Sequence, residues 1–261
     1  VPAFLSGSLC MIVVAVVLTG GMKRIAIFTE RLVPVMAAIY LAGAMLVLFF
    51  YRDRIAGAFA LIFQEAFRSS AAVGGVAGYS MKQAVRMGIA RGIFSNEAGL
   101  GSSVMAHAQS DVEDPKVQGM WGILEVFIDT VLVCTITALV ILVSQVPYWQ
   151  AGEIDGTTLT GMAFASVIPW GKEFLAGATA LFAFATMIGW FYFGAQTADY
   201  LAGEKGVKVY RFCYILITLP GCMIAPTMIW ELSDALNGMM AVPNLLALFF
   251  LEKEVAYVGK K

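Results

Sequence analysis

The sequence has little charge. Only 13% of its 261 residues are Asp, Glu, Lys or Arg, against about 25% in an average soluble domain. Its 17 basic and 18 acidic residues nearly balance, so no positive excess is available to bind the phosphates of a nucleic acid. Hydrophobic residues make up 60% of the chain and the mean hydropathy is +0.81, which excludes a disordered protein. The composition predicts an all-α integral membrane protein.

Histidine and paired cysteines are also scarce. His107 is the single histidine, and the four cysteines lie in apolar runs without a CxxC spacing. This excludes a centre with several histidine ligands and argues against a zinc or redox site. No motif pairs a nucleophile with a base, so we expect neither an enzyme nor a bound cofactor.

Apolar runs of about 20 residues, the length that crosses a bilayer, recur along the chain. They predict about seven transmembrane helices, of which the third is irregular and discontinuous: Ala3–Thr19, Leu32–Tyr51, a stretch within Ala71–Ala108, Val117–Ser144, Phe174–Leu201, Val209–Ala225 and Met228–Leu251. The segment Ala56–Phe67 is amphipathic, and is either a helix along the membrane interface or an extension of the second span.

Lys and Arg are unevenly divided between the two sets of loops. With seven crossings, one side and the C-terminal tail hold ten of them and the other side holds four. Cytoplasmic loops carry the excess of positive charge, which predicts a multi-pass protein of the cell (plasma or inner) membrane with a cytoplasmic C-terminus. The long loop Gln145–Gly171 then faces outward, flanked by Tyr148, Trp149 and Trp170.

The third span is unusually rich in glycine and contains polar residues. Seven glycines lie between Gly74 and Gly101, and Asn96 and Glu97 stand in mid-run. Glycine weakens a helix, and unwound backbone survives at membrane depth only where it is buried in protein or lines a cavity. Transporters use such breaks to bind anionic groups through N–H groups and cations through carbonyls. An aqueous loop between two helices is the alternative interpretation.

Two further pairs share one helical face at i, i+4 spacing. Glu125 and Asp129 place carboxylates in the fourth span, where acids indicate a functional site or a structural pair with a neighbouring helix. Thr186 and Trp190 place a hydroxyl beside an indole in the fifth span; simple helix packing is the alternative for Trp190.

Several motifs occur together in a recognisable order. They are RGIFSNEAGLGS (91–102), GGMKRI (20–25), ERLVP (30–34), FIDT (127–130), the run from Thr135 through Leu142, GW (189–190) and MAVPNL (240–245). Together they resemble the alanine/glycine:cation symporters, also called the sodium:alanine symporter family, over nearly the whole chain.

The resemblance implies a LeuT-type fold of two inverted repeats. Residues 1–70 would hold the last two helices of the first repeat and residues 71–261 the second repeat, within a single transmembrane transporter domain (1–261) that we expect to be N-terminally truncated. It also implies uptake of small neutral amino acids, alanine and glycine, coupled to sodium or protons by alternating access. A non-transporting membrane fragment with a structural or assembly role is the alternative.

The break and the resemblance together predict a set of binding residues, with the substrate side chain lying against Phe94, Met187 and Trp190. The expected partners are a small neutral amino acid, sodium (or a proton) and the lipid bilayer, with no nucleic acid. Substrate-binding residues would be Phe94, Asn96, Gly99, Gly101, Thr186, Met187 and Trp190, and sodium ligands Asn96, Glu97, Thr186 and Asp129.

Overall fold

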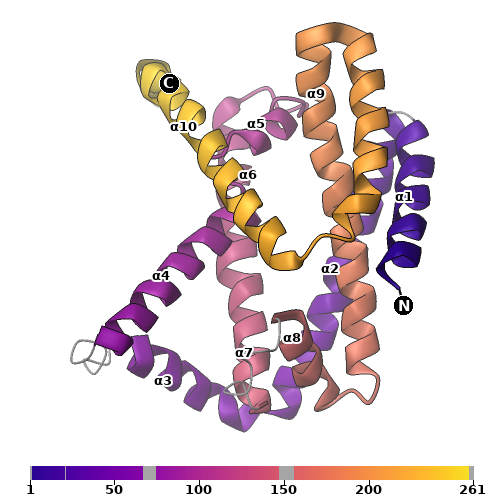
Figure 1. The fold of residues 1–261 in the computed structure, drawn as a ribbon. Helices are drawn as coiled ribbons and strands as arrows, with labels where there is room; N and C mark the ends of the chain where they lie inside the picture. The colour runs from indigo at the N-terminus through magenta and orange to yellow at the C-terminus, as the bar shows by residue number, and fades with distance from the viewer. Residues whose placement is uncertain (1, 21, 67–74, 147–155, 259–261) are drawn as a thin grey trace. The chain divides into compact units, whose positions relative to one another are not determined.

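A computed structural model describes residues 2–20, 22–66, 75–146 and 156–258. All regular structure in these ranges is helical, which confirms the all-α prediction for the described part of the chain (Figure 1). A 3₁₀ turn, η1 (Arg52–Arg54), precedes α3, and a π-helix, η3 (Ile128–Val133), joins α6 to α7. The helices are α1 (Ala3–Thr19), α2 (Met22–Phe50), α3 (Ile55–Ala66), α4 (Gly75–Asn96), α5 (Ser102–His107), α6 (Pro115–Phe127), α7 (Cys134–Ser144), α8 (Gly156–Ala165), α9 (Gly171–Gly221) and α10 (Pro226–Val258).

Four helical stretches of the described residues are long and apolar enough to cross a membrane. They are Glu30–Phe50, Pro115–Ser144, Gly171–Gly221 and Thr227–Lys253, and the 17-residue α1 is a shorter apolar helix. Helix α4, which carries the basic residues Lys82, Arg86 and Arg91, is not among these stretches. The number of seven crossings therefore stays a prediction.

The chain forms two compact units. Unit 1 consists of Val1–Met36, Gly99–Gln118 and Ala180–Lys261, and unit 2 of Ala37–Ala98 and Gly119–Thr179. The chain passes from unit 2 to unit 1 between Ala98 and Gly99, inside the glycine-rich stretch that the sequence predicts to be irregular.

The core of unit 1 forms where α1 packs against α9. Val14 and Leu18 of α1 are fully buried with Ile188 and Phe191 of α9. Helix α9 consists of two arms that run side by side with α1 (Figure 1), because Gly203 adopts φ 61° and ψ −158°, a backbone region that is essentially restricted to glycine. The predicted fifth and sixth spans are these two arms.

The core of unit 2 forms where α2, α7 and α8 meet. Tyr40 of α2 donates a hydrogen bond to Thr137 Oγ1 of α7 at 2.6 Å, and its ring lies 5.8 Å from that of Phe164 of α8. At the end of α7, Arg54 Nη1 donates to the carbonyl of Val143 at 3.0 Å and thereby satisfies a helix-terminal acceptor that has no partner within the helix.

Two of the predicted boundaries differ from the structure. The expected loop Gln145–Gly171 contains α8, and Trp170 is 60% exposed, whereas Tyr148 and Trp149 lie outside the described residues. The segment predicted as Ala56–Phe67 forms a separate helix, α3, because η1 interrupts the chain after α2. It is therefore no simple extension of the second span.

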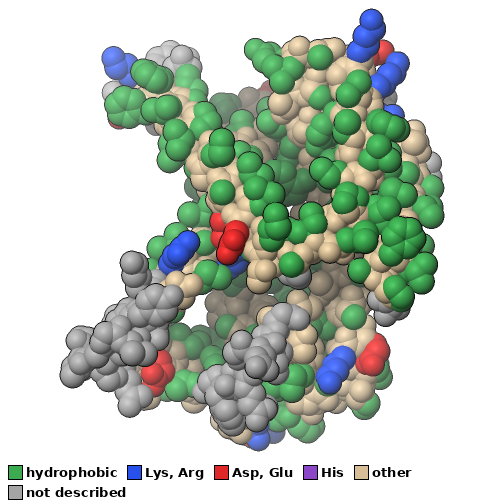
Figure 2. Space-filling model, viewed as in Figure 1, with side chains coloured by type: hydrophobic (Ala, Val, Ile, Leu, Met, Phe, Trp, Pro, Cys, Tyr) green, Lys and Arg blue, Asp and Glu red, His purple; other side chains and the backbone are tan. Residues whose placement is uncertain are grey.

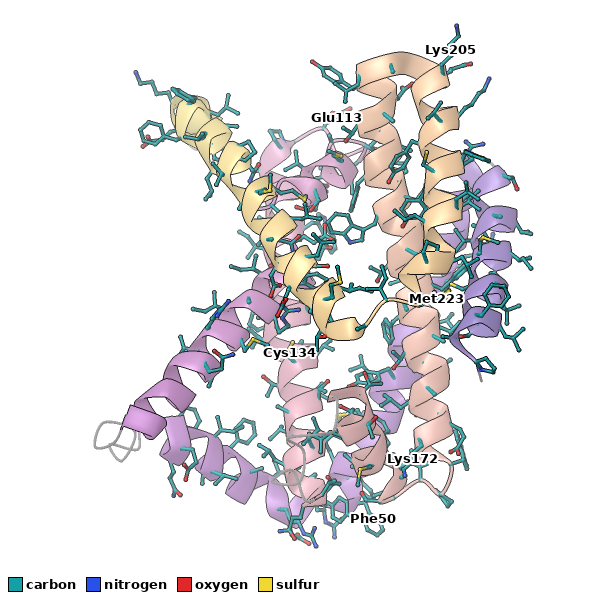
Figure 3. The ribbon with its side chains drawn as sticks, viewed as in Figure 1. Phe50, Glu113, Cys134, Lys172, Lys205 and Met223 are labelled. Atoms are coloured by element: carbon teal, nitrogen blue, oxygen red, sulfur yellow. The ribbon has the colours of Figure 1, made fainter. Side chains whose placement is uncertain are left out.

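Apolar side chains cover much of the visible face, with charged groups in a few places (Figure 2). In unit 1, one such place is the turn between the arms of α9, where Figure 3 labels Lys205. Helix α10 exposes a row of large apolar side chains, including Met239, Val242, Phe249 and Phe250. Exposed apolar surface of this extent fits a protein that is solvated by lipid.

Candidate functional site

The glycine-rich stretch contains a break in the helix. Helix α4 ends at Asn96, α5 begins at Ser102, and the residues between them are not helical. Glu97, Gly99 and Gly101 have φ values of 54°, 83° and 85°, in the left-handed region that glycine tolerates best. Asn96 Oδ1 accepts a hydrogen bond from the N–H of Ala98 at 2.9 Å and so stabilises the first turn of the break. The predicted interruption of the helix is confirmed.

In unit 2, the end of α4 is tied to the π-helix η3 by two hydrogen bonds. Ser95 Oγ donates to Asp129 Oδ1 at 2.9 Å, and Asn96 Nδ2 donates to Thr130 Oγ1, also at 2.9 Å. Two neighbouring residues of one helix thus meet two neighbouring residues of another. The structure brings Asn96 and Asp129, both predicted site residues, into one polar cluster, which we call the 95/129 cluster (Ser95, Asn96, Asp129, Thr130).

The π-helix positions this cluster. Asp129 and Thr130 are the second and third residues of η3, directly before the α7 helix that begins at Cys134, labelled in Figure 3. A π-helical turn adds a residue within an otherwise α-helical stretch and changes the direction of the side chains around it, and such turns occur often at functional sites. Thr130 is a site residue that sequence reasoning missed; its place beside Asp129 in the FIDT motif is the signal that could have identified it.

One oxygen of the cluster is left over. Asp129 Oδ2 is buried and has no hydrogen-bond partner among the described residues. A buried carboxylate oxygen without a partner is costly, and buried groups of this kind call for an explanation such as an ion or a water molecule. Among the described residues no three His, Cys, Asp or Glu side chains gather around it. The cluster therefore offers one carboxylate and neutral oxygens, which are hard ligands.

The other predicted residues of unit 2 lie close to the cluster residues in the sequence. The Arg91 guanidinium lies 5.4 Å from the centre of the Phe94 ring, and Phe94 is half-buried. Glu97 is half-buried within the break. Glu125, one turn before Asp129, is exposed, so the predicted i, i+4 pair is divided: only Asp129 belongs to the cluster.

In unit 1, a side chain of α10 holds the other half of the break. Asn244 Nδ2 donates to the carbonyl of Gly99 at 2.9 Å. A Cβ atom placed on Gly101 would lie 2.8 Å from Asn244 Oδ1. A side chain at Gly101 would therefore require the Asn244 carboxamide to shift. Asn244 stands in the MAVPNL motif, where a carboxamide after a proline in an apolar run is the signal that could have identified it.

A cavity of about 520 Å³ lies in unit 1 next to the same residues. Gly101 and Trp190, both predicted to bind substrate, line it together. Most of its wall is apolar, and the hydroxyls and the carboxamide that reach it are few, as in small-molecule sites. The lining residues are Leu100, Gly101, Ser102, Met105, Trp190, Phe193, Gly194, Thr197, Tyr210, Met240, Pro243 and Asn244.

Two predicted residues of α9 lie elsewhere in unit 1. Met187 packs into the α1–α9 core: its sulfur lies 3.8 Å from Cys10 Sγ, and its carbonyl accepts a hydrogen bond from the Tyr214 hydroxyl at 2.7 Å. Thr186 is exposed and does not line the cavity of unit 1. The face of α9 that reaches this cavity is that of Trp190, Phe193 and Thr197, so a binding role for Met187 or Thr186 stays a prediction.

Comparison with known proteins identifies the relatives of the chain. The chain is 36% identical over 257 residues to an uncharacterized transporter of Haemophilus influenzae, and the match covers 98% of this chain and 56% of that protein. It is 35% identical over 252 residues to the sodium/alanine symporter AgcS of Methanococcus maripaludis (96% and 55%). It is 36% identical over 251 residues to the probable sodium/glutamine symporter GlnT of Bacillus subtilis (95% and 51%).

The chain spans about half the length of the curated relatives it matches. Within that half, a sequence model of the sodium:alanine symporter family matches all of residues 1–261. The break between α4 and α5 and the polar groups that hold it lie inside the matched region. The chain belongs to the sodium:alanine symporter family.

Proposed function

We propose that the chain forms part of a secondary-active symporter that takes up small neutral amino acids, alanine and glycine, with sodium as the coupling ion. The observation that carries the proposal is the helix break at 97–101 together with the buried Oδ2 of Asp129, which has no hydrogen-bond partner among the described residues. The names of two relatives, a sodium/alanine symporter and a probable sodium/glutamine symporter, support this class of transport.

The proposed architecture is a LeuT-type inverted repeat in the cell membrane. Residues 1–70 contribute the last two helices of the first repeat and residues 71–261 the second repeat, whose broken helix is α4–α5. The excess of Lys and Arg on one side of the predicted spans supports a cytoplasmic C-terminus. Alternating access then moves the broken helix against the helices that surround it.

The proposed cation site is centred on the 95/129 cluster. Asp129 supplies its unpaired Oδ2 and Asn96 a carboxamide oxygen; the predicted set also includes Glu97 and Thr186. Sodium binds hard oxygen ligands, and a single carboxylate compensates its single charge. Transfer of that charge into a membrane interior without such a partner would be strongly unfavourable.

The proposed substrate contacts come from both parts of the broken helix. In unit 1, the N–H groups of the unwound residues Gly99 and Gly101 bind the carboxylate of the amino acid, and Trp190 packs against its side chain. In unit 2, Phe94 and Asn96 are proposed for the same substrate. Met187 and Thr186 complete the predicted set. Backbone N–H groups in an unwound turn favour an anionic group because they have no helical acceptor.

The test is alanine uptake by the complete protein in proteoliposomes, with and without an inward sodium gradient. We expect uptake by the wild type to require the gradient, and Asn96→Ala to reduce uptake at least tenfold, since the substitution removes the bonds to Ala98 and Thr130 as well as a proposed ligand. Asn237→Ala, on α10, is the control and should transport normally. Wild-type uptake that ignores the gradient would contradict the proposal.

A further inference from the structure

We propose that Asn244 of α10 is a positioning residue that holds the unwound stretch 99–101 in its binding conformation. Its part in transport rests on the proposed function; its part in the structure of the break does not. No predicted site residue lies on α10, so this assigns a role to a helix that the sequence-based site leaves out.

The first observation is the hydrogen bond to Gly99. The carbonyl of Gly99 lies in the break, so it does not accept the hydrogen bond that it would accept in a continuous helix. Asn244 Nδ2 donates to it at 2.9 Å. Unwound backbone within a membrane protein needs such partners, since a polar group without one costs several kcal/mol in hydrocarbon.

The second observation is the contact with Gly101. A Cβ atom there would lie 2.8, 3.0 and 3.3 Å from Oδ1, Cγ and Cβ of Asn244. Gly101 also has φ 85°. By contrast, Gly99 has a similar φ of 83° with nothing within 4 Å of its Cβ position. Asn244 thus meets the break at two points two residues apart, one polar and one steric, which fixes both the position and the orientation of the turn.

The third observation is the cavity. Asn244, Gly101 and Trp190 line the same 520 Å³ space. A shift of the α10 carboxamide would therefore move the backbone of a proposed substrate contact relative to the indole opposite it. Since this backbone is a proposed contact of the substrate carboxylate, we expect the effect of Asn244 to be seen in substrate affinity.

The structural part is tested by hydrogen exchange without any substrate. In Asn244→Ala and in Asn244→Leu, a variant of similar size without a donor, we expect the amides of residues 99–102 to exchange at least tenfold faster than in the wild type. Asn237→Ala, about two turns earlier on α10, is the matched control and should exchange like the wild type. Unchanged exchange at 99–102 in both Asn244 variants would overturn the proposal.

A double-mutant cycle tests the steric contact. Gly101→Ala should lower the thermal midpoint of the protein in detergent, and should lower it less when combined with Asn244→Ala, because the clash with Oδ1 and Cγ is then gone. Gly99→Ala, which carries the same backbone strain without a clash, measures the strain alone. Effects of Gly101→Ala and Asn244→Ala that add without interaction would contradict the contact.

The functional part is tested by kinetics of alanine uptake. We expect Asn244→Ala to raise KM at least fivefold while kcat changes less than twofold, and Asn237→Ala to change neither. An unchanged KM at normal membrane abundance would refute the positioning role. Absence of uptake by the wild type would contradict the proposed function instead, while the exchange experiment would still decide the role of Asn244 in the break.

Discussion

At the residue scale, the side chains that hold the break are uncharged, apart from one carboxylate. In unit 2 the donors Ser95 and Asn96 meet Asp129 and Thr130, and in unit 1 the donor Asn244 meets Gly99. These few bonds hold residues 97–101 in the observed conformation.

Thr130 is the neutral acceptor of the 95/129 cluster, and its hydroxyl can be removed with little change of shape. Thr130→Val leaves the Asn96 Nδ2 donor without its acceptor, which costs about 1–3 kcal/mol for a buried group. We expect the KM for alanine to rise about tenfold, the equivalent of about 1.4 kcal/mol, in uptake measurements. Thr130→Ser keeps the hydroxyl and should stay within twofold of the wild type; equal effects of Val and Ser would contradict the role of the bond.

Some of these residues are easier to identify from the sequence than others. Asn96, Asp129 and the glycines stand out because polar or flexible residues are unusual in an apolar span. Thr130 and Asn244 carry weaker signals, and their hydrogen-bond partners are determined by tertiary packing and not by local pattern. Met187 packs against Cys10 beside the α1–α9 core, and its predicted place at the floor of the binding pocket stays a prediction.

At the element scale, the sequence predicts helices well and their irregularities poorly. The break at 97–101 was predicted because glycine and polar residues interrupt an apolar run. The π-helix η3 was not, since the six residues Ile128–Val133 are too few to show a periodicity that differs from that of the α-helices on either side. Helix α8 was hidden within the predicted loop Gln145–Gly171 because its ten residues are too few to span a bilayer.

The turn from α8 to α9 in unit 2 depends on Gly171. A Cβ atom at this position would contact the backbone nitrogen of Ala165 and lie 2.7 Å from the carbonyl oxygen of Phe164. Backbone atoms cannot rotate away, so Gly171→Ala should lower the free energy of unfolding by about 1–3 kcal/mol, as overpacking does. The measurement is thermal unfolding in detergent.

Gly177→Ala is the matched control for this turn. Gly177 also lies in α9, and nothing lies within 4 Å of its Cβ position. Since alanine favours a helix over glycine by roughly 1 kcal/mol, this variant should be as stable as the wild type or slightly more so. A Gly171→Ala protein as stable as the Gly177→Ala protein would show that the turn has another conformation.

At the scale of the whole molecule, the composition indicates a protein that is solvated by lipid, and the family match gives the class of protein. The scarcity of charge predicted a membrane protein, and the motif order predicted the family that the comparison confirms. The number of crossings stays a prediction, because in the described part of the chain four helical stretches qualify by length and composition and α4 does not. The inverted repeat and the orientation stay predictions as well. Helix α4 carries three basic residues, and the break begins at its C-terminal end.

The central claim is that the 95/129 cluster binds the coupling ion. The most direct test is the sodium concentration that gives half-maximal alanine uptake in proteoliposomes, measured for the wild type and for Asp129→Asn. Glu125→Gln is the control, since it removes an exposed carboxylate one turn away. We predict that Asp129→Asn raises this concentration at least tenfold or abolishes the sodium dependence, while Glu125→Gln leaves it unchanged. An Asp129→Asn protein with the sodium dependence of the wild type would contradict the account.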